Sequence, residues 1–427
     1  MNNNIFERIP QPYIGPRPFE RNLDDQKRFF GREMEVEEIV SFIVSHRVVL
    51  IYGKSGAGKT SIFNAQVIPT LERYGFTVLP ISRVYASIIS DQLSSHISEY
   101  ESDITNIYLF NALENLVSDV EPKLLKNKSL SEFLNEYFPI KQDKNNHDVP
   151  QILIFDQFEE FFNIFPRNWK EQREDFFNHI GKALHDMTSL QIVFLIREDY
   201  LAQLEAYNNL LPEKFGPRFR LERLGKDSAL LAIKGPLKNL PKDLIQNYKG
   251  DIDKEINNIV HELMKIQIKD SSGKTLEIEG ESIEPIQLQV VLKKWYEKIT
   301  NPNSKLLKDD IYVSNVDIAL EEFYEHAIND AINKCKIKEK DIRKWCEEKL
   351  ITSSGTKSNV HRSLDSIEGL KNDVIDILEN LYFIKGYWHA GAKWYELSQD
   401  RLVQSIISSN HKWKNSGKNK MKFGFRK

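Results

Sequence analysis

The sequence is poor in the features that mark secreted, zinc-binding or membrane proteins. Only two of its 427 residues are cysteines, Cys335 and Cys346, and they form no C-x-x-C pair. This argues against a disulfide framework and a zinc site. No apolar run approaches the roughly 18 residues of a membrane span, and the polar Met-Asn-Asn-Asn start lacks the core of a signal peptide. We therefore expect a chain of the reducing cytoplasm that makes no membrane contact.

The chain also lacks an excess of either charge. It has 59 lysines and arginines against 62 aspartates and glutamates, for a net charge of -3. Such a balance does not favour nucleic-acid binding by the chain as a whole. One local exception is residues 411–427, where basic residues occur without any acid. We interpret this basic tail as a solvated chain end.

What the sequence does contain is a complete phosphate-binding motif, G-x-x-x-x-G-K-T, directly after the apolar run Val48–Tyr52. Its glycines let successive backbone N–H groups turn inward around phosphate oxygens. Lys59 is the residue that reaches the terminal phosphates, and the Thr60 hydroxyl can ligate Mg²⁺. The motif and its neighbour predict these nucleotide-binding residues: Gly53, Lys54, Ser55, Gly56, Ala57, Gly58, Lys59, Thr60 and Ser61.

A second motif, Ile152-Leu-Ile-Phe-Asp156, is an apolar strand that ends in acids. Asp156 would lie beside the phosphate loop and hold the Mg²⁺ ion together with Thr60. Glu159 and Glu160 follow on the next turn, and either could activate the attacking water. We favour Glu160 as this base and keep Glu159 as the alternative.

An arginine ends another apolar strand, in Leu-Ile-Arg197-Glu-Asp-Tyr. At that position it can point to the terminal phosphate and stabilise its charge, so Arg197 joins Lys59, Asp156, Glu159 and Glu160 as a predicted catalytic residue. The alternative is a structural arginine at the sheet edge. Arg218 and Arg220 are second-line candidates of the same kind.

Apolar strands and helices alternate over residues 48–224, which predicts an α/β fold with a doubly wound parallel sheet. Four strands are expected: Val48–Tyr52, Thr77–Ile81, Gln151–Phe155 and Gln191–Ile196. An entry segment precedes this P-loop NTPase domain at residues 1–47. A helical lid domain is expected at 225–335, a winged-helix domain at 336–413 and the basic tail at 414–427. The winged helix is suggested by helices over 370–381 and 400–409, around a hairpin that turns at 386–391.

Several short motifs occur in an order that resembles the STAND-class P-loop NTPases, within the AAA+/NACHT-like group. The resemblance is closest to the bacterial STAND ATPases of conflict and signalling systems. Beyond the phosphate loop it rests on these segments: Tyr13-Ile-Gly-Pro-Arg-Pro-Phe19, Phe29-Phe-Gly-Arg-Glu33, Phe155-Asp-Gln-Phe-Glu-Glu-Phe161, Arg197-Glu-Asp-Tyr-Leu201, Gly235-Pro236 and Tyr395-Glu-Leu-Ser-Gln-Asp-Arg-Leu-Val403.

The resemblance implies further binding residues. Arg32 would pack near adenine and ribose, and Pro236 in the lid would contact the base or sugar. Gln399 stands where the family has a histidine that reads the ADP β-phosphate. Because glutamine carries no charge, the closed state held by this contact would be weaker or differently set.

The resemblance also implies a function. We expect a molecular switch that binds and slowly hydrolyses ATP with Mg²⁺, and that oligomerises or activates a partner in bacterial signalling or antiphage defence. Neither effector nor sensor is visible in the sequence, so both are expected from partner chains. The alternative is an ATP-dependent DNA-binding regulator that uses the winged helix and basic tail. The acids of 370–381 disfavour it, and a salt-dependent shift assay with and without residues 411–427 would test it.

Overall fold

The structure is a computed structural model. It describes residues 11–85, 103–240, 251–269, 275–300, 315–353, 355–362, 366–367, 369–389 and 392–423. Within these residues no helix is both long and apolar enough to cross a membrane.

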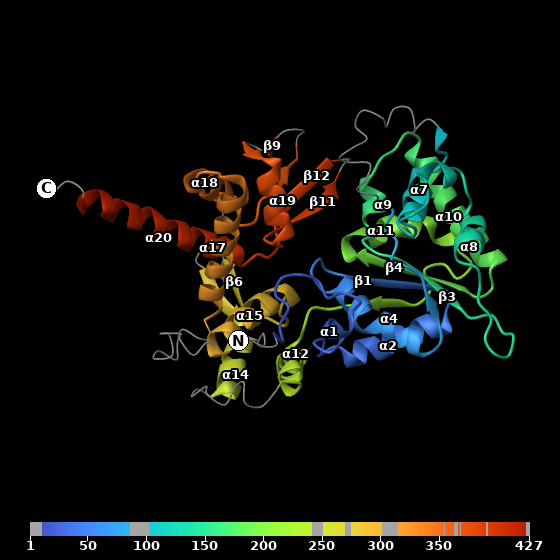
Figure 1. Ribbon diagram of the computed structural model, residues 1–427, viewed down its shortest axis with the longest axis horizontal. Helices are drawn as coiled ribbons and strands as arrows, with labels where there is room; N and C mark the ends of the chain where they lie inside the picture. The colour runs from blue at the N-terminus through green and yellow to red at the C-terminus, as the bar shows by residue number, and fades with distance from the viewer. Residues whose placement is uncertain are drawn as a thin grey trace, which may run out of the picture.

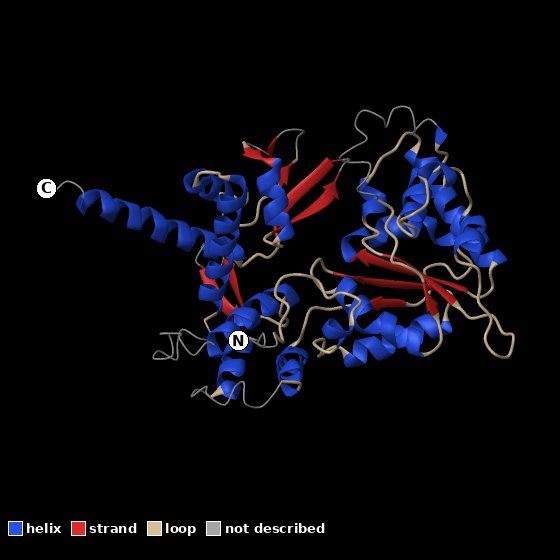
Figure 2. Cartoon of the chain, in the orientation of Figure 1, coloured by secondary structure: helices blue, strands red, loops and turns tan. Residues whose placement is uncertain are grey.

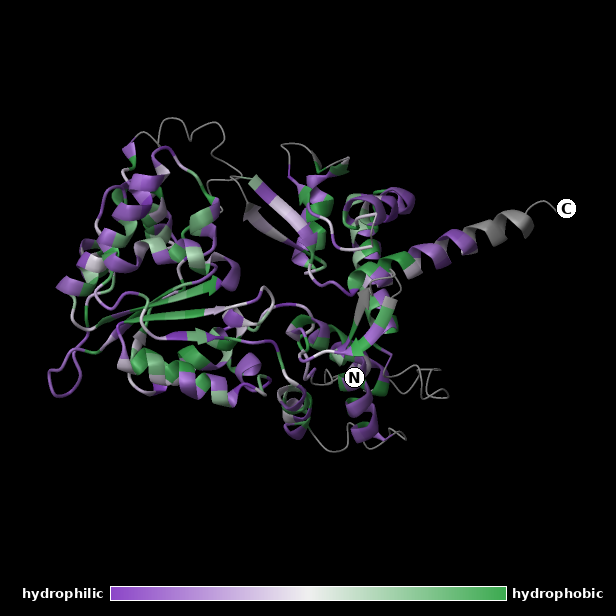
Figure 3. Ribbon diagram, turned by 180° about the vertical axis from the view of Figure 1, so that it is seen from behind, coloured by the Kyte–Doolittle hydropathy of each residue, from purple (hydrophilic) through white to green (hydrophobic). Residues whose placement is uncertain are grey.

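A parallel sheet forms the centre of the N-terminal half (Figure 2). It has five strands in the order β2-β3-β4-β1-β5. The central strands β3, β4 and β1 are mostly apolar, as expected of a sheet covered on both faces (Figure 3). The strands are β1 (Val48–Gly53), β2 (Thr77–Val78), β3 (Gln151–Phe155), β4 (Leu190–Arg197) and β5 (Arg218–Arg220). The predicted parallel α/β sheet is therefore confirmed.

Two details of the sheet differ from the prediction. β2 ends at Val78 rather than at Ile81, because Pro80 has no N–H for the ladder, and pairing resumes only at the isolated bridge between Ser82 and Phe155. The fifth strand, β5, was not predicted. It is three residues long and two of these are arginines, so no apolar run marks it.

Helices cover both faces of the sheet (Figure 1). On one face, α2 packs against β1, and the helix that follows the phosphate loop packs beside it. The opposite face carries α7, α8 and α10. The bounds are α1 (Leu23–Gln26), α2 (Glu33–Ser45), α3 (Lys59–Ile62), η1 (Phe63–Val67), α4 (Ile68–Arg73), α7 (Ile107–Glu114), η3 (Pro122–Leu124), α8 (Leu130–Tyr137), α9 (Glu160–Asn163), α10 (Trp169–Asp186), η4 (Glu198–Tyr200), α11 (Leu201–Leu204) and η5 (Glu205–Leu210).

The helix that follows the phosphate loop contains a π-helical turn, η1, between α3 and α4. Pro69 near the start of α4 cannot donate a hydrogen bond to the carbonyl four residues earlier, and a wider turn accommodates this loss. The widened turn begins only at Phe63, so it leaves the start of α3 at Lys59 unchanged.

Aromatic packing fixes the turn that follows β3. The Phe158 and Phe161 rings stack with centroids 5.0 Å apart, and both contact Phe176 of α10. Phe158 also lies edge-on to Phe194 of β4, at 4.8 Å. With these rings held in the core, the acidic residues between and beside them are left at the edge of the sheet.

Residues 226–335 are here called the helical segment. In its described part lie α12 (Lys226–Lys238), α14 (Ile252–Met264), α15 (Pro285–Thr300) and α17 (Val316–Cys335). It also contains a hairpin of β6 (Lys265–Lys269) and β7 (Thr275–Glu279). This hairpin was not predicted for the helical lid domain expected at 225–335. The alternating residues of the two strands carry a period of two that is too short to stand out beside the helices.

Residues 339–423, here called the C-terminal segment, pack on the helical segment through one continuous core. Helix, antiparallel hairpin and helix follow each other as predicted: α19 (Asn372–Asn380), β11 (Ile384–His389) with β12 (Ala392–Leu397), and α20 (Leu402–Phe423). The remaining elements are α18 (Glu339–Lys349), β8 (Val360–His361), β9 (Ser366–Ile367) and β10 (Leu370–Lys371). The last helix is longer than predicted, and its distal end extends away from the other elements (Figure 1). Assignment of this segment to the winged-helix class stays a prediction.

Candidate functional site

The phosphate loop, residues 53–60, joins the end of β1 to the start of α3. Gly56 and Gly58 have φ angles of 77° and 96°, which side chains rarely allow. Gly53 is required for a different reason, because a Cβ there would lie 2.3 Å from the Leu221 carbonyl oxygen. The glycines of the motif are therefore explained by backbone shape and close packing, and the loop ends at the N-terminus of a helix, which favours anions.

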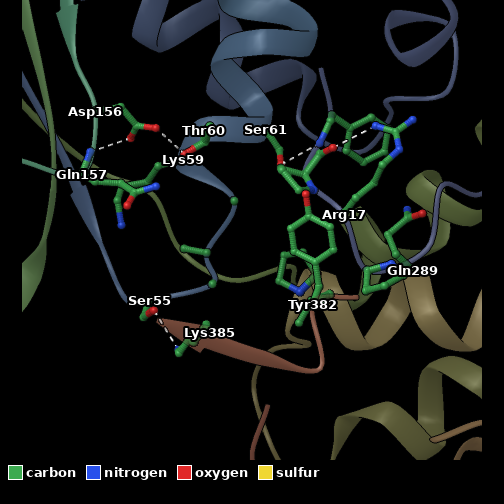
Figure 4. A pocket seen from close by; sticks show the side chains of 18 of the residues that line it. Arg17, Ser55, Lys59, Thr60, Ser61, Asp156, Gln157, Gln289, Tyr382 and Lys385 are labelled. Atoms are coloured by element: carbon green, nitrogen blue, oxygen red, sulfur yellow. Dashed lines mark hydrogen bonds between the residues drawn. The ribbon is translucent and has the colours of Figure 1, made fainter. Parts of the chain in front are cut away.

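Lys59 and Thr60 end the loop and face the acids that follow β3. The Lys59 Nζ donates to the carbonyls of Gly53 and Lys54 at 3.1 and 3.4 Å. Burial lowers the pKa of Lys59, and the neighbouring Glu159 and Asp156 oppose this. The Thr60 hydroxyl donates to Asp156 Oδ2 at 2.7 Å (Figure 4).

The two glutamates after β3 have different surroundings. One carboxylate oxygen of Glu159 accepts a hydrogen bond from the backbone N–H of Arg197 at 3.2 Å. Among the neighbouring acids, Glu159 also has the largest effect on the pKa of Lys59. Glu160 is buried, and its two carboxylate oxygens accept hydrogen bonds from Nε and Nη2 of Arg83. Burial raises the pKa of both carboxyls, that of Glu160 to about 7, and Lys59 and Arg83 respectively oppose the rise.

Arg197 lies at the carboxyl end of β4, as predicted. Its guanidinium donates to Asp199 at 2.5 Å and lies 5.9 Å from the centre of the Tyr200 ring. Its Nε is buried without a partner among the described residues. The side chain thus has an unused donor beside Glu159, one of the acids that follow β3. Arg218 and Arg220, by contrast, pair with Glu205 and with Glu198 and Glu222 on the outside of β5.

A cavity of about 370 Å³ opens over the phosphate loop, within the size range of small-molecule sites. Three parts of the chain line it: the N-terminal half, the helical segment and the C-terminal segment (Figure 4). The lining residues are Gly15 to Phe19, Arg28 to Phe30, Arg32, Ser55 to Ser61, Asp156, Gln157, Glu159, Glu160, Asn163, Arg197, Tyr200, Leu224, Ala232, Pro285, Ile286, Leu288, Gln289, Tyr382, Lys385, Gly386, Tyr387 and Trp388.

Every predicted catalytic residue and most of the predicted nucleotide-binding residues meet at this cavity. Gly53 and Lys54 are not among its lining residues. Arg32 is, but its guanidinium already donates to the carbonyls of Ala57 and Glu222, at 3.3 and 2.7 Å, and so braces the loop. Ser61 accepts the Phe19 N–H at 3.2 Å, which ties the entry segment to α3.

Two residues implied by the family resemblance lie outside the lining. Pro236 is buried within α12. Gln399 is fully buried after β12, and both polar atoms of its side chain are without a partner in the described part of the chain. In this arrangement neither side chain reaches the cavity surface.

Sequence reasoning missed the contribution of the C-terminal segment to the site. Lys385 of β11 donates to Ser55 Oγ in the phosphate loop at 3.0 Å, and Tyr382 faces the entry segment near Arg17 (Figure 4). The Arg83–Glu160 pair was missed as well. No local sequence pattern predicts that Lys385 contacts a serine 330 positions earlier, because this contact depends on how the segments pack.

The oxygen groups at the loop fit a magnesium-bound nucleotide. The Thr60 hydroxyl and Asp156 carboxylate are hard oxygen ligands of the kind Mg²⁺ prefers. Among the residues that the structure describes, no group of three or more acidic, histidine or cysteine side chains could hold a metal. A magnesium ion here would therefore need phosphate oxygens and water to complete its shell.

A parallel sheet with this loop, and with an acid at the carboxyl end of another strand of the same sheet, defines the class of P-loop nucleoside triphosphatases. The chain belongs to the family described as Novel STAND NTPase 1, whose model matches residues 12–259, more than half of its length. This confirms the STAND resemblance.

Solved structures with a similar fold include a Walker-type ATPase, PABY2304 of Pyrococcus abyssi. It is 13% identical in sequence, with a TM-score of 0.46, and the match covers 92% of this chain and 98% of the P. abyssi chain. The ORC2 protein of Aeropyrum pernix, in ADPNP–ADP complexes, is 12% identical with coverage of 94% and 98% and a TM-score of 0.45. The ORC1 protein of that organism, in complex with DNA, is 13% identical with coverage of 89% and 92% and a TM-score of 0.40. No curated protein matches the sequence.

Proposed function

We propose that this NTPase is an ATP-driven molecular switch, in which bound nucleotide holds three parts of the chain together. The supporting observation is the single cavity that the phosphate loop, the helical segment and the C-terminal segment line in common. A ligand held by all three parts favours the arrangement in which they meet. In this proposal the helical segment is the lid, and the C-terminal segment is the winged helix.

We assign the chemistry to the residues around the loop. Lys59 and the loop N–H groups bind the phosphates, and Thr60 and Asp156 hold Mg²⁺. Magnesium would neutralise charge on the phosphates when bound. Arg197 stabilises charge at the terminal phosphate through its unpaired Nε–H.

Glu159 is our choice for the residue that orients and deprotonates water. Our preference from the sequence was Glu160, but its carboxylate is buried and occupied by Arg83. Glu159 is less buried and lies close to Lys59, the residue that marks the terminal phosphates.

Family membership supports a proposal for the biological output. We propose that the ATP-bound form oligomerises or activates an effector supplied by another chain, in bacterial signalling or antiphage defence. Purification of the tagged protein with ATP and with ADP, followed by identification of bound proteins, tests this. An effector captured only in the ATP form supports the proposal, and identical partners in both forms contradict it.

The DNA-binding alternative has less support from the contacts of α20. Lys412 pairs with Glu321 and Lys414 with Glu347, so two tail cations are already neutralised within the chain. The helix α19 carries Asp373, Asp376 and Glu379 and no basic residue. Both observations weaken the positive surface that phosphate backbones require.

Lys59→Ala tests the nucleotide site itself. Removing the ammonium should weaken ATP binding by at least a hundredfold and abolish hydrolysis, because the terminal phosphates lose their main cation. Titration calorimetry with a non-hydrolysable ATP analogue and phosphate release measure the two effects. Lys182→Ala is the matched control, since Lys182 is exposed on α10 and does not line the cavity. Unchanged binding by Lys59→Ala would contradict the site.

A further inference from the structure

The C-terminal segment brings one cation to the phosphate loop. Lys385 lies on β11, and its Nζ donates to Ser55 Oγ at 3.0 Å (Figure 4). Among the lysines of the described residues, only Lys59 and Lys385 line the cavity. Lys59 belongs to the loop motif, whereas Lys385 comes from a strand more than 300 residues later in the chain.

The contact lies at one particular end of the loop. The Lys59 Nζ, which in this motif reaches the terminal phosphates, donates to the carbonyls of Gly53 and Lys54. Ser55 is the next residue along the backbone. Lys385 therefore approaches the loop where the terminal phosphates are expected, rather than at the end where Tyr382 and the entry segment lie.

One carboxylate holds Lys385 in this position, and a second lies beside the loop. Glu396 on the paired strand β12 accepts from its Nζ at 2.9 Å. Glu284 before α15 touches the loop, because a Cβ on Gly56 would lie 2.8 Å from its Oε1. Arg223 pairs with Glu284 at 3.3 Å. An ammonium has three donors, so Lys385 can keep Ser55 and Glu396 and still contact a third oxygen.

We propose that Lys385 is a phosphate-binding residue, which the C-terminal segment contributes to the terminal phosphate of bound ATP. This rests on the proposed nucleotide site and adds to it a direct link between that phosphate and β11. The link makes the position of the C-terminal hairpin (β11 with β12) depend on the terminal phosphate, since a charge-assisted bond forms only when phosphate and hairpin are both in place.

The test compares nucleotides that share the base but differ in phosphates. Lys385→Gln should weaken binding of a magnesium-bound, non-hydrolysable ATP analogue by about tenfold or more, and leave AMP affinity unchanged. Lys385→Arg keeps the positive charge and should retain most of the ATP-analogue affinity. Titration calorimetry on the full chain measures all three, and thermal unfolding checks that the variants are folded.

Lys393→Gln is the matched control. Lys393 lies on the same hairpin and pairs with Glu379 at 3.0 Å, but it does not line the cavity. It should bind the ATP analogue as the unsubstituted protein does. Equal ATP-analogue affinity for Lys385→Gln and the unsubstituted protein would overturn the inference, as would an equal loss for AMP. If the unsubstituted protein bound no nucleotide, the proposed function itself would fail.

Discussion

Glu159 and Glu160 are adjacent in the sequence but face different partners, and this difference decides their expected roles. Glu159→Gln should lower ATP hydrolysis by roughly a hundredfold or more while ATP stays bound, because a general base contributes rate and little ground-state binding. Glu160→Gln should cost less hydrolysis, since its carboxylate is occupied by Arg83. Single-turnover phosphate release and equilibrium binding measure the two effects.

The exposed Glu171 of α10 provides a matched control for these variants, and Glu171→Gln should behave as the unsubstituted protein. If Glu160→Gln lost more ATP hydrolysis than Glu159→Gln, the general base would be Glu160, which is the residue favoured from the sequence.

The raised pKa of Glu160 also has a consequence for stability. Burial moves this pKa from an ordinary value of 4.5 to about 7. Between these values the folded protein keeps a proton that the unfolded chain has lost, so this group's contribution to the free energy of unfolding falls as pH rises. The stability of the unsubstituted protein relative to Glu160→Gln should therefore decrease from about pH 4.5 to 7. Urea unfolding across that range measures it, and a constant or growing difference would contradict the assignment.

At the scale of elements, the sequence predicted what is encoded locally. The strand Gln151–Phe155 has the predicted bounds, because a short apolar run sets its own ends. The phosphate loop was equally visible, since its glycines are demanded by backbone shape within a few residues. The predicted catalytic residues converge because the strands that carry them are neighbours in one parallel sheet.

The elements that were missed depend on pairing between distant segments. β5 is a strand because Phe219 packs under the sheet and Arg218 pairs with Leu50 of β1 in register, which no three-residue pattern reveals. The β6–β7 hairpin and the Lys385 contact have the same origin. For the candidate site, the part carried by β1, β3 and β4 was predictable, and the part carried by the C-terminal segment was not.

Three helices of the C-terminal half are joined by one buried arginine. Arg343 of α18 pairs with Glu325 of α17 at 2.6 Å and donates to Asn410 of α20 at 3.2 Å, with 4% of its side chain exposed. Arg343→Ala should lower the free energy of unfolding by about 3 kcal/mol, because it leaves half-buried acids without their partner. The midpoint of urea unfolding measures this.

The neighbouring lysine serves as the control for that loss. Lys344 is exposed and lies 3.9 Å from Glu348, so Lys344→Ala should change stability by no more than about 0.5 kcal/mol. A comparable cost for both variants would show that Arg343 does not join the helices as its contacts indicate.

At the scale of the whole molecule, the nucleotide cavity lies where the N-terminal half meets the C-terminal segment. Besides Lys385, contact between these parts includes the Tyr85 and Trp388 rings, whose centroids are 4.7 Å apart. A contact between two rings can form whichever nucleotide is bound. The proposed contact of Lys385 with the terminal phosphate, by contrast, can form only when ATP is bound. The balance between open and closed arrangements should therefore be set at the loop, and any partner that prefers one arrangement must in turn change nucleotide affinity.

This coupling can be observed as protection from hydrogen exchange. A non-hydrolysable ATP analogue should slow exchange of the amides of β11 and of the first turn of α15, because both elements line the cavity and lose their freedom to open when the ligand binds. The strands β6 and β7 do not line the cavity, so their exchange should change little. Lys59→Ala should show no protection under the same conditions. Protection confined to the phosphate loop, with β11 and α15 unchanged, would mean that nucleotide binds without holding the three parts together.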